Sequence, residues 1–375
     1  MISYLIPDMP VTEQLIPYLN EIDNNHWYSN FGPLYTKLKQ RVSKELLESV
    51  DEDRLTLVSS GSSAIELALK SLDLPRGAKV LAPSFTFPAT IQAILNSGLS
   101  PIICDVDEYN WCLTPEIATR NLLLHDIAAI LPVAAFGMPV CSSSWAQFYK
   151  HTGIPVVVDA AAALLSQPIN DNIFYAFSLH ATKPFGVGEG GLVVCPSESY
   201  ATRIKKMSNF GFEPNRNIKL AGTNAKISEF HCAVGLAQID RILDIKNKRT
   251  KILNHYLQLF KKFRLNISLQ NGYEASPPAS LYILFNQVDS CELFETMLSK
   301  GIETRRLYLP LIQDFPAFKD NCELASLNFK NAQKVCFYYI TNITVFHKAW
   351  IYFMCDFIMS LLQFTPMLTR VYVMS

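Results

Sequence analysis

The chain has 375 residues, of which 49% are hydrophobic, and its 33 basic and 33 acidic residues give a net charge of zero. This balance, without a long run of either sign, argues against a nucleic-acid or membrane-surface partner and leaves a small ligand as the expectation. The length suffices for one large domain and a second, smaller one.

Apolar strand patterns alternate with helical patterns through the first half of the chain. We predict strands over residues 78–84, 100–106, 127–136, 155–161, 172–179 and 190–195. Helices are predicted between the first four of these, including ATIQAILNSG, which Gly98 ends, and the segment 115–124. Strands that are apolar on both faces and are separated by helices indicate a mostly parallel sheet flanked by helices. The large domain is therefore predicted to be α/β.

The pattern changes after residue 227. Residues 227–263 are helical in pattern with one charged face, which predicts one or two long helices that lead to a smaller α+β unit. In that unit we predict a strand at LYILFNQV and a helix through Leu298. We therefore divide the chain into a large domain with its N-terminal segment (1–245), a small C-terminal domain (246–335) and an apolar tail (336–375).

Three predicted strand ends or helix starts carry residues of types that can bind a ligand or take part in catalysis. Ser60, Gly61, Ser62 and Ser63 lead directly into an apolar helical pattern, so a helix N-terminus with free N–H groups is offered to an anion such as phosphate. The alternative is that a serine simply caps the helix. Asp159 ends the apolar strand PVVVDAA, where a carboxylate needs a cation or several donors, although it could equally cap a following helix.

The third segment is SLHATKPFGVGEGG, from Ser178 to Gly191. Pro184 and the four glycines that follow it break regular structure, so Lys183 is predicted to lie on a loop and not on a surface helix. A deprotonated lysine attacks aldehydes, a carboxylate keeps a pyridine nitrogen protonated, and a serine-rich helix start holds a phosphate. Pyridoxal 5'-phosphate makes all three demands in one molecule.

Six segments that occur in order between Trp27 and Val335 resemble the DegT/DnrJ/StrS family of sugar aminotransferases: SGSSAIELAL, APSFTFPATIQAILNSG, PIICDVD, VVVDAAAA, FSLHATKPFGVGEGGLVV and GTNAKISEFHCAVGLAQIDRI. The resemblance implies the type I fold of pyridoxal-phosphate-dependent transferases. The segments KMSNFGF and TRRLYLPLIQDFPAF most resemble the branch that acts on keto groups of nucleotide-linked deoxysugars.

The resemblance assigns roles to particular residues. Lys183 matches the lysine that bonds the cofactor, Asp159 the carboxylate paired with its ring nitrogen, and Ser178 a phosphate-binding serine. The phosphate cup is matched by Ser62 and Ser63, and the aromatic residue that stacks on the ring by Phe87. The alternative for Phe87 is an ordinary core phenylalanine.

The partners follow from the same resemblance. Asn224 matches a residue that reaches the phosphate in the neighbouring subunit, which implies a homodimer with shared active sites. The expected activity is transfer of an amino group from an amino acid, glutamate by resemblance, to a nucleotide-linked keto-deoxysugar, for synthesis of a surface polysaccharide. Lys183 would then carry a proton between the donor's α-carbon and the cofactor. A lysine at this position argues against the dehydratases of the family, which carry histidine there.

Five further residues are candidates for substrate contacts. They are His180, Glu189, Arg305, Arg306 and Tyr28. The two arginines would suit a diphosphate, because a guanidinium matches phosphate oxygens, but solvated surface arginines are the alternative. His180 has an equally plausible structural role.

Composition and the N-terminal segment bear on location. The nine cysteines are scattered and never spaced as CxxC, which favours reduced thiols and argues against a zinc site, so no metal is expected. The opening MISYLIPDMPVTEQ lacks the features of a secretory signal. We therefore expect a cytoplasmic protein.

Two departures from the family pattern stand out. Ala162 occupies a position where the family has Gln or His near the cofactor's phenolic oxygen. After Val335 the resemblance stops, and the tail carries only Lys348, Asp356 and Arg370 as charged residues. A membrane helix, a variant small domain and a change of reading frame are the three explanations, of which we favour the last. The rival functional hypothesis is accordingly a catalytically impaired homologue that binds the cofactor.

Overall fold

The fold is described from a computed structural model, which describes residues 3–48, 50–264, 266–273, 277–285, 290–326 and 328–341. The predicted tail falls outside the described residues from 342 onward. None of the helices in the described ranges is both long enough and apolar enough to span a membrane.

The centre of the large domain is a sheet in which the predicted strands lie side by side. One half has the order β1-β7-β6-β5 and the other β10-β3-β2-β4. Parallel bridges from Ile130 to Val156 and from Val133 to Asp159 join β4 to β5. The strands are β1 (Leu55–Val58), β2 (Lys79–Pro83), β3 (Ser100–Cys104), β4 (Ile127–Ile130), β5 (Val157–Asp159), β6 (Phe174–Ser178), β7 (Gly191–Val194) and β10 (Glu323–Leu324).

Strand direction is mostly parallel, as predicted. The pairs β2–β3, β2–β4 and β5–β6 are parallel, whereas β7 is antiparallel to both β6 and β1. The residues of β6 are buried almost throughout, which agrees with a strand covered on both faces. Strand β1 and the antiparallel direction of β7 are absent from the sequence-based prediction.

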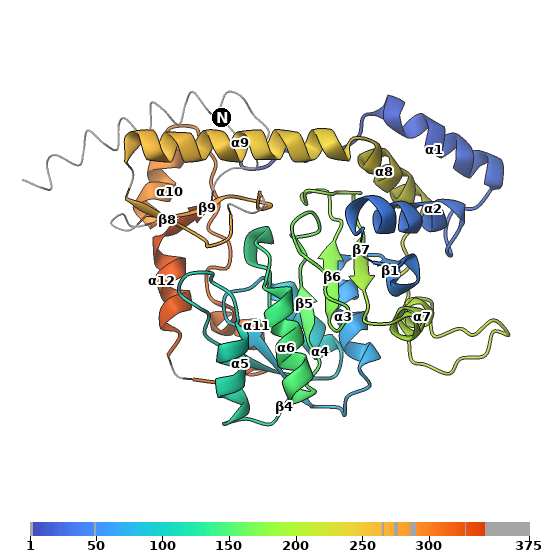
Figure 1. The fold of residues 1–375 in the computed structure, drawn as a ribbon, viewed down its shortest axis with the longest axis horizontal. Helices are drawn as coiled ribbons and strands as arrows, with labels where there is room; N and C mark the ends of the chain where they lie inside the picture. Colours follow the sequence, from blue (N-terminus) through green and yellow to red (C-terminus); the bar gives the residue numbers. More distant parts are fainter. Residues whose placement is uncertain are drawn as a thin grey trace, which may run out of the picture.

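Helices cover the sheet and connect its strands (Figure 1). Helix α3 packs against β5, β6 and β7, and α1 and α2 pack on α8. Gly98, at φ +74°, follows the last turn of α4 as predicted. The helices are α1 (Thr12–Asn25), α2 (Pro33–Arg41), α3 (Gly61–Ser71), α4 (Pro88–Asn96), α5 (Pro115–Leu122), α6 (Ser142–Thr152), α7 (Glu198–Met207), α8 (Glu229–Asp240), α9 (Ile242–Phe263), α10 (Ser290–Ser299), α11 (Pro316–Lys319) and α12 (Lys330–Tyr338).

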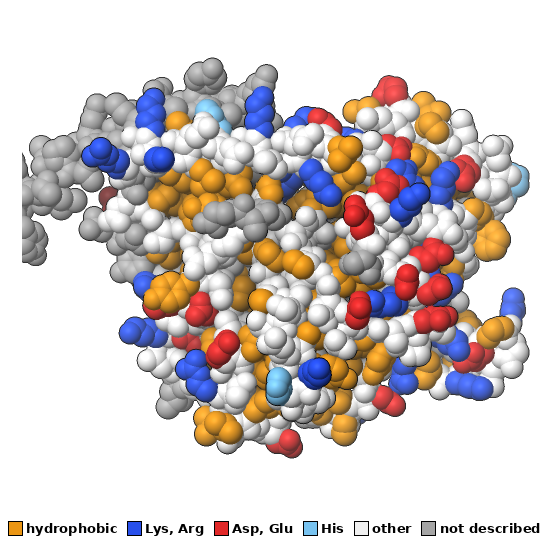
Figure 2. Space-filling view, viewed as in Figure 1, with side chains coloured by type: hydrophobic (Ala, Val, Ile, Leu, Met, Phe, Trp, Pro, Cys, Tyr) orange, Lys and Arg blue, Asp and Glu red, His pale blue; other side chains and the backbone are white. Residues whose placement is uncertain are grey.

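A second, smaller core forms beyond α8. Helix α9 runs along one edge of the molecule and ends beside α10 and a small antiparallel sheet with the order β11-β9-β8 (Figure 1). Its strands are β8 (Ile267–Leu269), β9 (Tyr282–Phe285) and β11 (Tyr339–Thr341). The core residues come from these elements and include Tyr256, Phe260, Ile283 and Met297. Figure 2 shows basic side chains projecting along α9 with apolar side chains directly beneath it.

The predicted limits of the small domain differ from the structure in two ways. The boundary between residues 245 and 246 falls inside α9. The segment from Leu311 to Cys336 places Ile312, Phe318 and Ala332 in the core of the large domain, and β10 extends the large sheet beside β3. The chain therefore leaves the large domain at α9 and returns to it before α12.

Candidate active site

A cavity of about 400 Å³ lies where β2, β4, β5 and β6 end. The connection after β2 leads to β3, which lies on one side of β2. The connection after β4 leads to β5, which lies on the opposite side. The loops that follow the neighbouring strands β2 and β4 therefore diverge. Ligands of open α/β sheets bind at such a point. The predicted residues that line this cavity are Ser62, Phe87, Asp159, Ser178, His180, Lys183 and Glu189.

Lys183 lies in the loop after β6, as the sequence predicts. Its backbone N–H donates to the carbonyl of His180 at 2.8 Å, and Ala181 donates to the carbonyl of Gly188 at 2.8 Å. A Cβ added to Gly186 would lie 2.7 Å from the carbonyl oxygen of Ala181, so this loop requires a glycine for its close approach. Burial lowers the pKa of the Lys183 amine, and the negative charge of Asp159 opposes that shift. A lysine with a lowered pKa is more often neutral and is then nucleophilic.

Asp159 is the last residue of β5 and is only 4% exposed. Its carboxylate accepts a hydrogen bond from the hydroxyl of Thr90 at 2.7 Å and one from the backbone N–H of Ala161 at 3.1 Å. Burial raises the pKa of this carboxyl, against the hydrogen bonds and the nearby Lys183. Residues 160–166 form turns and not a helix, so Asp159 does not act as a helix cap. A buried carboxylate at this position is suited to a cationic N–H group in the cavity.

The start of α3 forms one wall. The hydroxyl of Ser60 accepts the backbone N–H of Ser63 at 3.0 Å and lies 2.9 Å from its hydroxyl, so Ser60 is the N-cap. The capping explanation therefore holds for Ser60, and the anion-site explanation stays a prediction for Ser62. Ser62 is exposed and lines the cavity. Ser63 is hydrogen-bonded to Ser60 in the helix cap and is not one of the residues that line the cavity.

Ser178 closes the same wall. Its hydroxyl accepts the backbone N–H of His180 at 3.2 Å. A Cβ added to Gly61 would lie 2.6 Å from the Cβ of Ser178, so the glycine allows the helix start and the end of β6 to touch. The N–H groups of the first turn of a helix have no partners within it, and together with Ser62 and Ser178 they can hold a phosphate.

Aromatic side chains form the rest of the cavity. Phe87 is 56% exposed and lines the cavity, so it is not a core residue. Phe136, Tyr282 and Tyr308 also line it, and Phe136 stacks on both tyrosines; none of the three was among the predicted site residues. Phe136 and Tyr308 have φ values of +61° and +63°, which are unusual for residues with bulky side chains. Tyr282 and Tyr308 lie far in the sequence from Asp159 and Lys183, so no local sequence pattern predicts that they line this cavity.

Four predicted residues lie elsewhere in the described part of this chain. Asn224 is exposed and accepts a hydrogen bond from the amine of Lys226 at 2.7 Å. Arg305 donates to the carboxylate of Glu303 at 2.6 Å, and Arg306 to the sulfur of Cys291 at 2.7 Å. Tyr28 stacks on Phe230 with ring centres 6.2 Å apart. None of the four lines the cavity that contains Lys183. Ala162 does, so its small side chain leaves space there.

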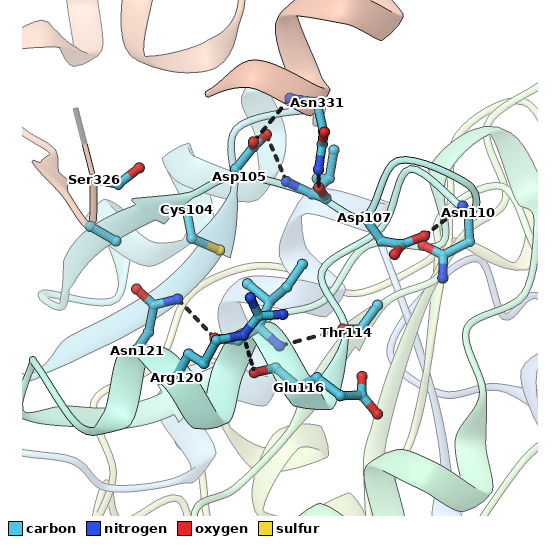
Figure 3. A pocket seen from close by; sticks show the side chains of 13 residues that line it. Cys104, Asp105, Asp107, Asn110, Thr114, Glu116, Arg120, Asn121, Ser326 and Asn331 are labelled. Atoms are coloured by element: carbon cyan, nitrogen blue, oxygen red, sulfur yellow. Dashed lines mark hydrogen bonds between the residues drawn. The ribbon is translucent and has the colours of Figure 1, made fainter. Parts of the chain in front are cut away.

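A second, larger cavity of about 530 Å³ lies at the end of β3 beside α5 (Figure 3). Its polar side chains serve the fold. The carboxylate of Asp105 accepts the backbone N–H groups of Asn331 and Ala332 at 3.0 and 2.9 Å and thereby caps α12. The Asp107 carboxylate accepts the N–H of Asn110 at 2.9 Å, and Arg120 donates to the carbonyl of Glu116 at 3.3 Å. Its size therefore does not make it the candidate site.

The cavity around Lys183 fits pyridoxal phosphate. Its volume is in the range usual for cofactor sites. It combines an amine of lowered pKa, a buried carboxylate and a helix N-terminus, which correspond to the aldehyde, the ring nitrogen and the phosphate of the cofactor. The combination, and not any one residue, indicates the cofactor.

Comparison with known proteins agrees with this geometry. The model of the DegT/DnrJ/EryC1/StrS aminotransferase family matches residues 10–343, which is past Val335, where the resemblance seen in the sequence ends. A dTDP-4-amino-4,6-dideoxy-D-glucose transaminase of Shigella dysenteriae is 28% identical over 88% of this chain and 90% of its own. A GDP-perosamine synthase of Escherichia coli O157:H7 is 25% identical over 78% and 81%.

Solved structures show the same architecture. A putative PLP-dependent aminotransferase of Bacillus cereus has a TM-score of 0.83 and 28% sequence identity, with 93% of this chain and 97% of that chain covered. The predicted type I fold is thereby confirmed. The chain belongs to the DegT/DnrJ/EryC1/StrS aminotransferase family and is a transaminase that uses pyridoxal phosphate.

Proposed function

We propose that this enzyme transfers an amino group from an amino acid, glutamate being the expected donor, to the keto group of a nucleotide-linked deoxysugar. The observation that carries the proposal is the placement of Lys183 and Asp159 in one cavity beside the start of α3. The names of the relatives support a nucleotide-linked sugar as acceptor, because two of them are enzymes of such sugars. One relative is named for a dTDP-linked and one for a GDP-linked compound, so the base is left open.

In this proposal each wall of the cavity holds one part of the cofactor. Asp159 holds the ring nitrogen, Phe87 covers a ring face, and Ser62 and Ser178 with the start of α3 hold the phosphate. When bound, pyridoxal phosphate supplies an electron sink for the negative charge that develops at the carbon next to nitrogen. Lys183 anchors the cofactor and then serves as the general base that moves the proton of the donor's α-carbon.

We also propose that two copies of the chain complete each site. Asn224 is exposed and lies outside the cavity of its own chain. In a homodimer it can serve the cavity of the neighbouring copy, as the family resemblance implies. Arg305 and Arg306, which also lie outside the cavity, remain candidates for the diphosphate of the substrate. A role in surface-polysaccharide synthesis and a cytoplasmic location stay predictions.

The proposal is tested with purified protein loaded with pyridoxal phosphate. An absorbance scan follows the near-visible cofactor band while glutamate and other amino acids are added, with Lys183→Ala as the control. We expect glutamate to remove the band in the wild type, and a nucleotide-linked keto-deoxysugar to restore it. Amino sugar is then identified by mass spectrometry.

The outcomes separate the hypotheses. A band that responds to donors but is restored by no nucleotide-linked keto sugar contradicts the proposed acceptor. A band that forms and responds to no donor favours the impaired homologue. The absence of any band in the wild type contradicts the site itself.

A further inference from the structure

Amino transfer to a ketone requires a proton donor for the keto oxygen, a role that neither Lys183 nor Asp159 fills. The keto oxygen leaves as water, so it must gain two protons while a nitrogen attacks the keto carbon. Lys183 serves the carbon-bound proton, and Asp159 is buried and held by Thr90 and Ala161. Another acid–base group has to face the cavity. This argument rests on the proposed function.

His180 is the one histidine among the described residues that line the cavity. The backbone N–H of Thr182 donates to its Nδ1 at 3.2 Å, and the Thr182 hydroxyl lies 2.7 Å from the same nitrogen. Because Nδ1 accepts, the ring's proton resides on Nε2. The nearest carboxylate oxygen, on Glu189, lies 3.7 Å from Nε2, which is too far for a direct hydrogen bond. The Nε2–H is therefore available to an oxygen atom that enters the cavity.

Glu189 holds this arrangement from the other side. Its carboxylate favours the tautomer with the proton on Nε2, because that N–H faces the negative charge. The loop that carries it is held by the hydrogen bond from the Ala181 N–H to the Gly188 carbonyl, and a Cβ added to Gly188 would lie 3.4 Å from the ring of His231. Both ends of the pair are thus fixed by backbone contacts, while the side chains of His180 and Glu189 remain 43% and 62% exposed.

We propose that His180 is the acid–base residue that serves the keto oxygen, with Glu189 and Thr182 as its positioning residues. As the C–N bond forms, negative charge develops on the oxygen and positive charge on the attacking nitrogen. The neutral imidazole of His180 passes its Nε2 proton to the oxygen as Nε2 takes a proton from the nitrogen, so no imidazolate anion is left. A second such exchange delivers the other proton of the nitrogen to the oxygen, the C–O bond breaks and water leaves. No oxidant or reductant is needed, and the imidazole ends in its starting state. The reverse sequence serves release of the keto acid from the amino donor.

The first test measures each half-reaction in single turnovers with His180→Gln, which keeps hydrogen bonding but cannot carry a proton. His151→Gln, a change of an exposed histidine on α6, is the matched control. We expect both half-reactions of His180→Gln to slow by roughly 100- to 10,000-fold, with the cofactor band intact and the substrate concentration for half-maximal rate little changed. A loss confined to substrate binding, or a rate equal to that of the control, overturns the proposal.

The second test needs no turnover. Long-range proton–nitrogen spectra of protein labelled with nitrogen-15 histidine report the tautomer of each imidazole, and His180→Gln identifies the signals of His180. We expect the Nε2–H tautomer in the wild type. Because Thr182 still donates to Nδ1 in Glu189→Gln, we expect the same tautomer there, with the Nε2 signal shifted by loss of the charge that faces it. A Nδ1–H tautomer in the wild type, or a Nε2 signal that does not respond to Glu189→Gln, overturns the proposal.

Failure of the proposed acceptor is distinguishable from failure of this inference. If no nucleotide-linked keto sugar is aminated, the donor half-reaction still contains the same oxygen chemistry and still tests His180. If the acceptor is correct and His180→Gln is as fast as His151→Gln, only the inference is wrong.

Discussion

Replacing Asp159 by Asn removes one charge from the cavity and leaves the shape of the side chain nearly unchanged. The carboxylate is 4% exposed and accepts hydrogen bonds from Thr90 and Ala161, both of which an amide oxygen can still accept in part. The unloaded protein should therefore keep its stability within about 1 kcal/mol, since a costly buried charge is removed at the same time.

Cofactor binding should respond much more. A hydrogen bond between a charged carboxylate and a ring N–H contributes about 1.5–3 kcal/mol. Its loss corresponds to roughly 10- to 150-fold weaker binding of pyridoxal phosphate. The pKa of Lys183 should also fall further, because the Asp159 charge is what opposes the effect of burial on that amine. The donor half-reaction should slow by about 100- to 1,000-fold, as expected for loss of one preorganised electrostatic contact.

The assay is an absorbance titration of pyridoxal phosphate into unloaded protein, followed by single-turnover kinetics with the amino donor. Asp244→Asn is the control, because Asp244 is an exposed residue of α9 paired with Lys248. Thermal unfolding of both unloaded variants checks that the fold is kept. Binding and rate equal to those of the control would refute the assignment of Asp159 to the ring nitrogen.

Of three further predictions, two concern packing and charge at the cavity and one concerns the start of α2. Gly61→Ala places a Cβ 2.6 Å from that of Ser178, so urea unfolding should show a loss of about 1–3 kcal/mol together with weaker phosphate binding. Unchanged stability would show that the start of α3 and the end of β6 do not touch. Burial lowers the pKa of Lys183, so between that lowered pKa and pH 10.5 the unfolded chain binds more protons than the native one. The free energy of unfolding of the wild type should therefore rise toward pH 10.5, relative to that of Lys183→Met. A difference in unfolding free energy that stays constant with pH would contradict this. The Glu229 carboxylate caps α2 by accepting the backbone N–H groups of Leu34 and Tyr35 at 2.7 and 3.0 Å. Glu229→Ala removes this acceptor and should lower the free energy of unfolding by about 2–4 kcal/mol in the same urea assay. A loss below about 0.5 kcal/mol would show that α2 does not need this cap.

The sequence predicts the large domain well because its strands carry a strong local signal. Strands such as β5 and β6 are short apolar runs bounded by polar residues, and the structure places each within its predicted range. Strand β1 was missed because LTLV, a run of four residues, gives little pattern, and the antiparallel direction of β7 depends on its neighbours. The return of residues 311–336 to the large core was missed for a similar reason, since β10 has only two residues.

The sequence likewise predicts some residues of the candidate site and not others. Lys183, Asp159 and Ser62 follow strand ends or open a helix, so their placement at one edge of the sheet follows from fold topology. Tyr282 and Tyr308 reach the cavity from other segments, and Thr90 reaches Asp159 from the start of α4. Their sequence contexts are typical of cores and helix starts. Their roles depend on tertiary contacts that no local pattern reports.

In the proposed function, pyridoxal phosphate is bonded covalently to one particular lysine. Loading the protein with pyridoxal phosphate, reducing it with borohydride and mapping the modified peptides by mass spectrometry identifies that lysine directly. We expect a pyridoxyl group on the peptide that contains Lys183, and its loss from that peptide in Lys183→Ala. A label on a different lysine, or no label on a protein that binds the cofactor, would contradict it.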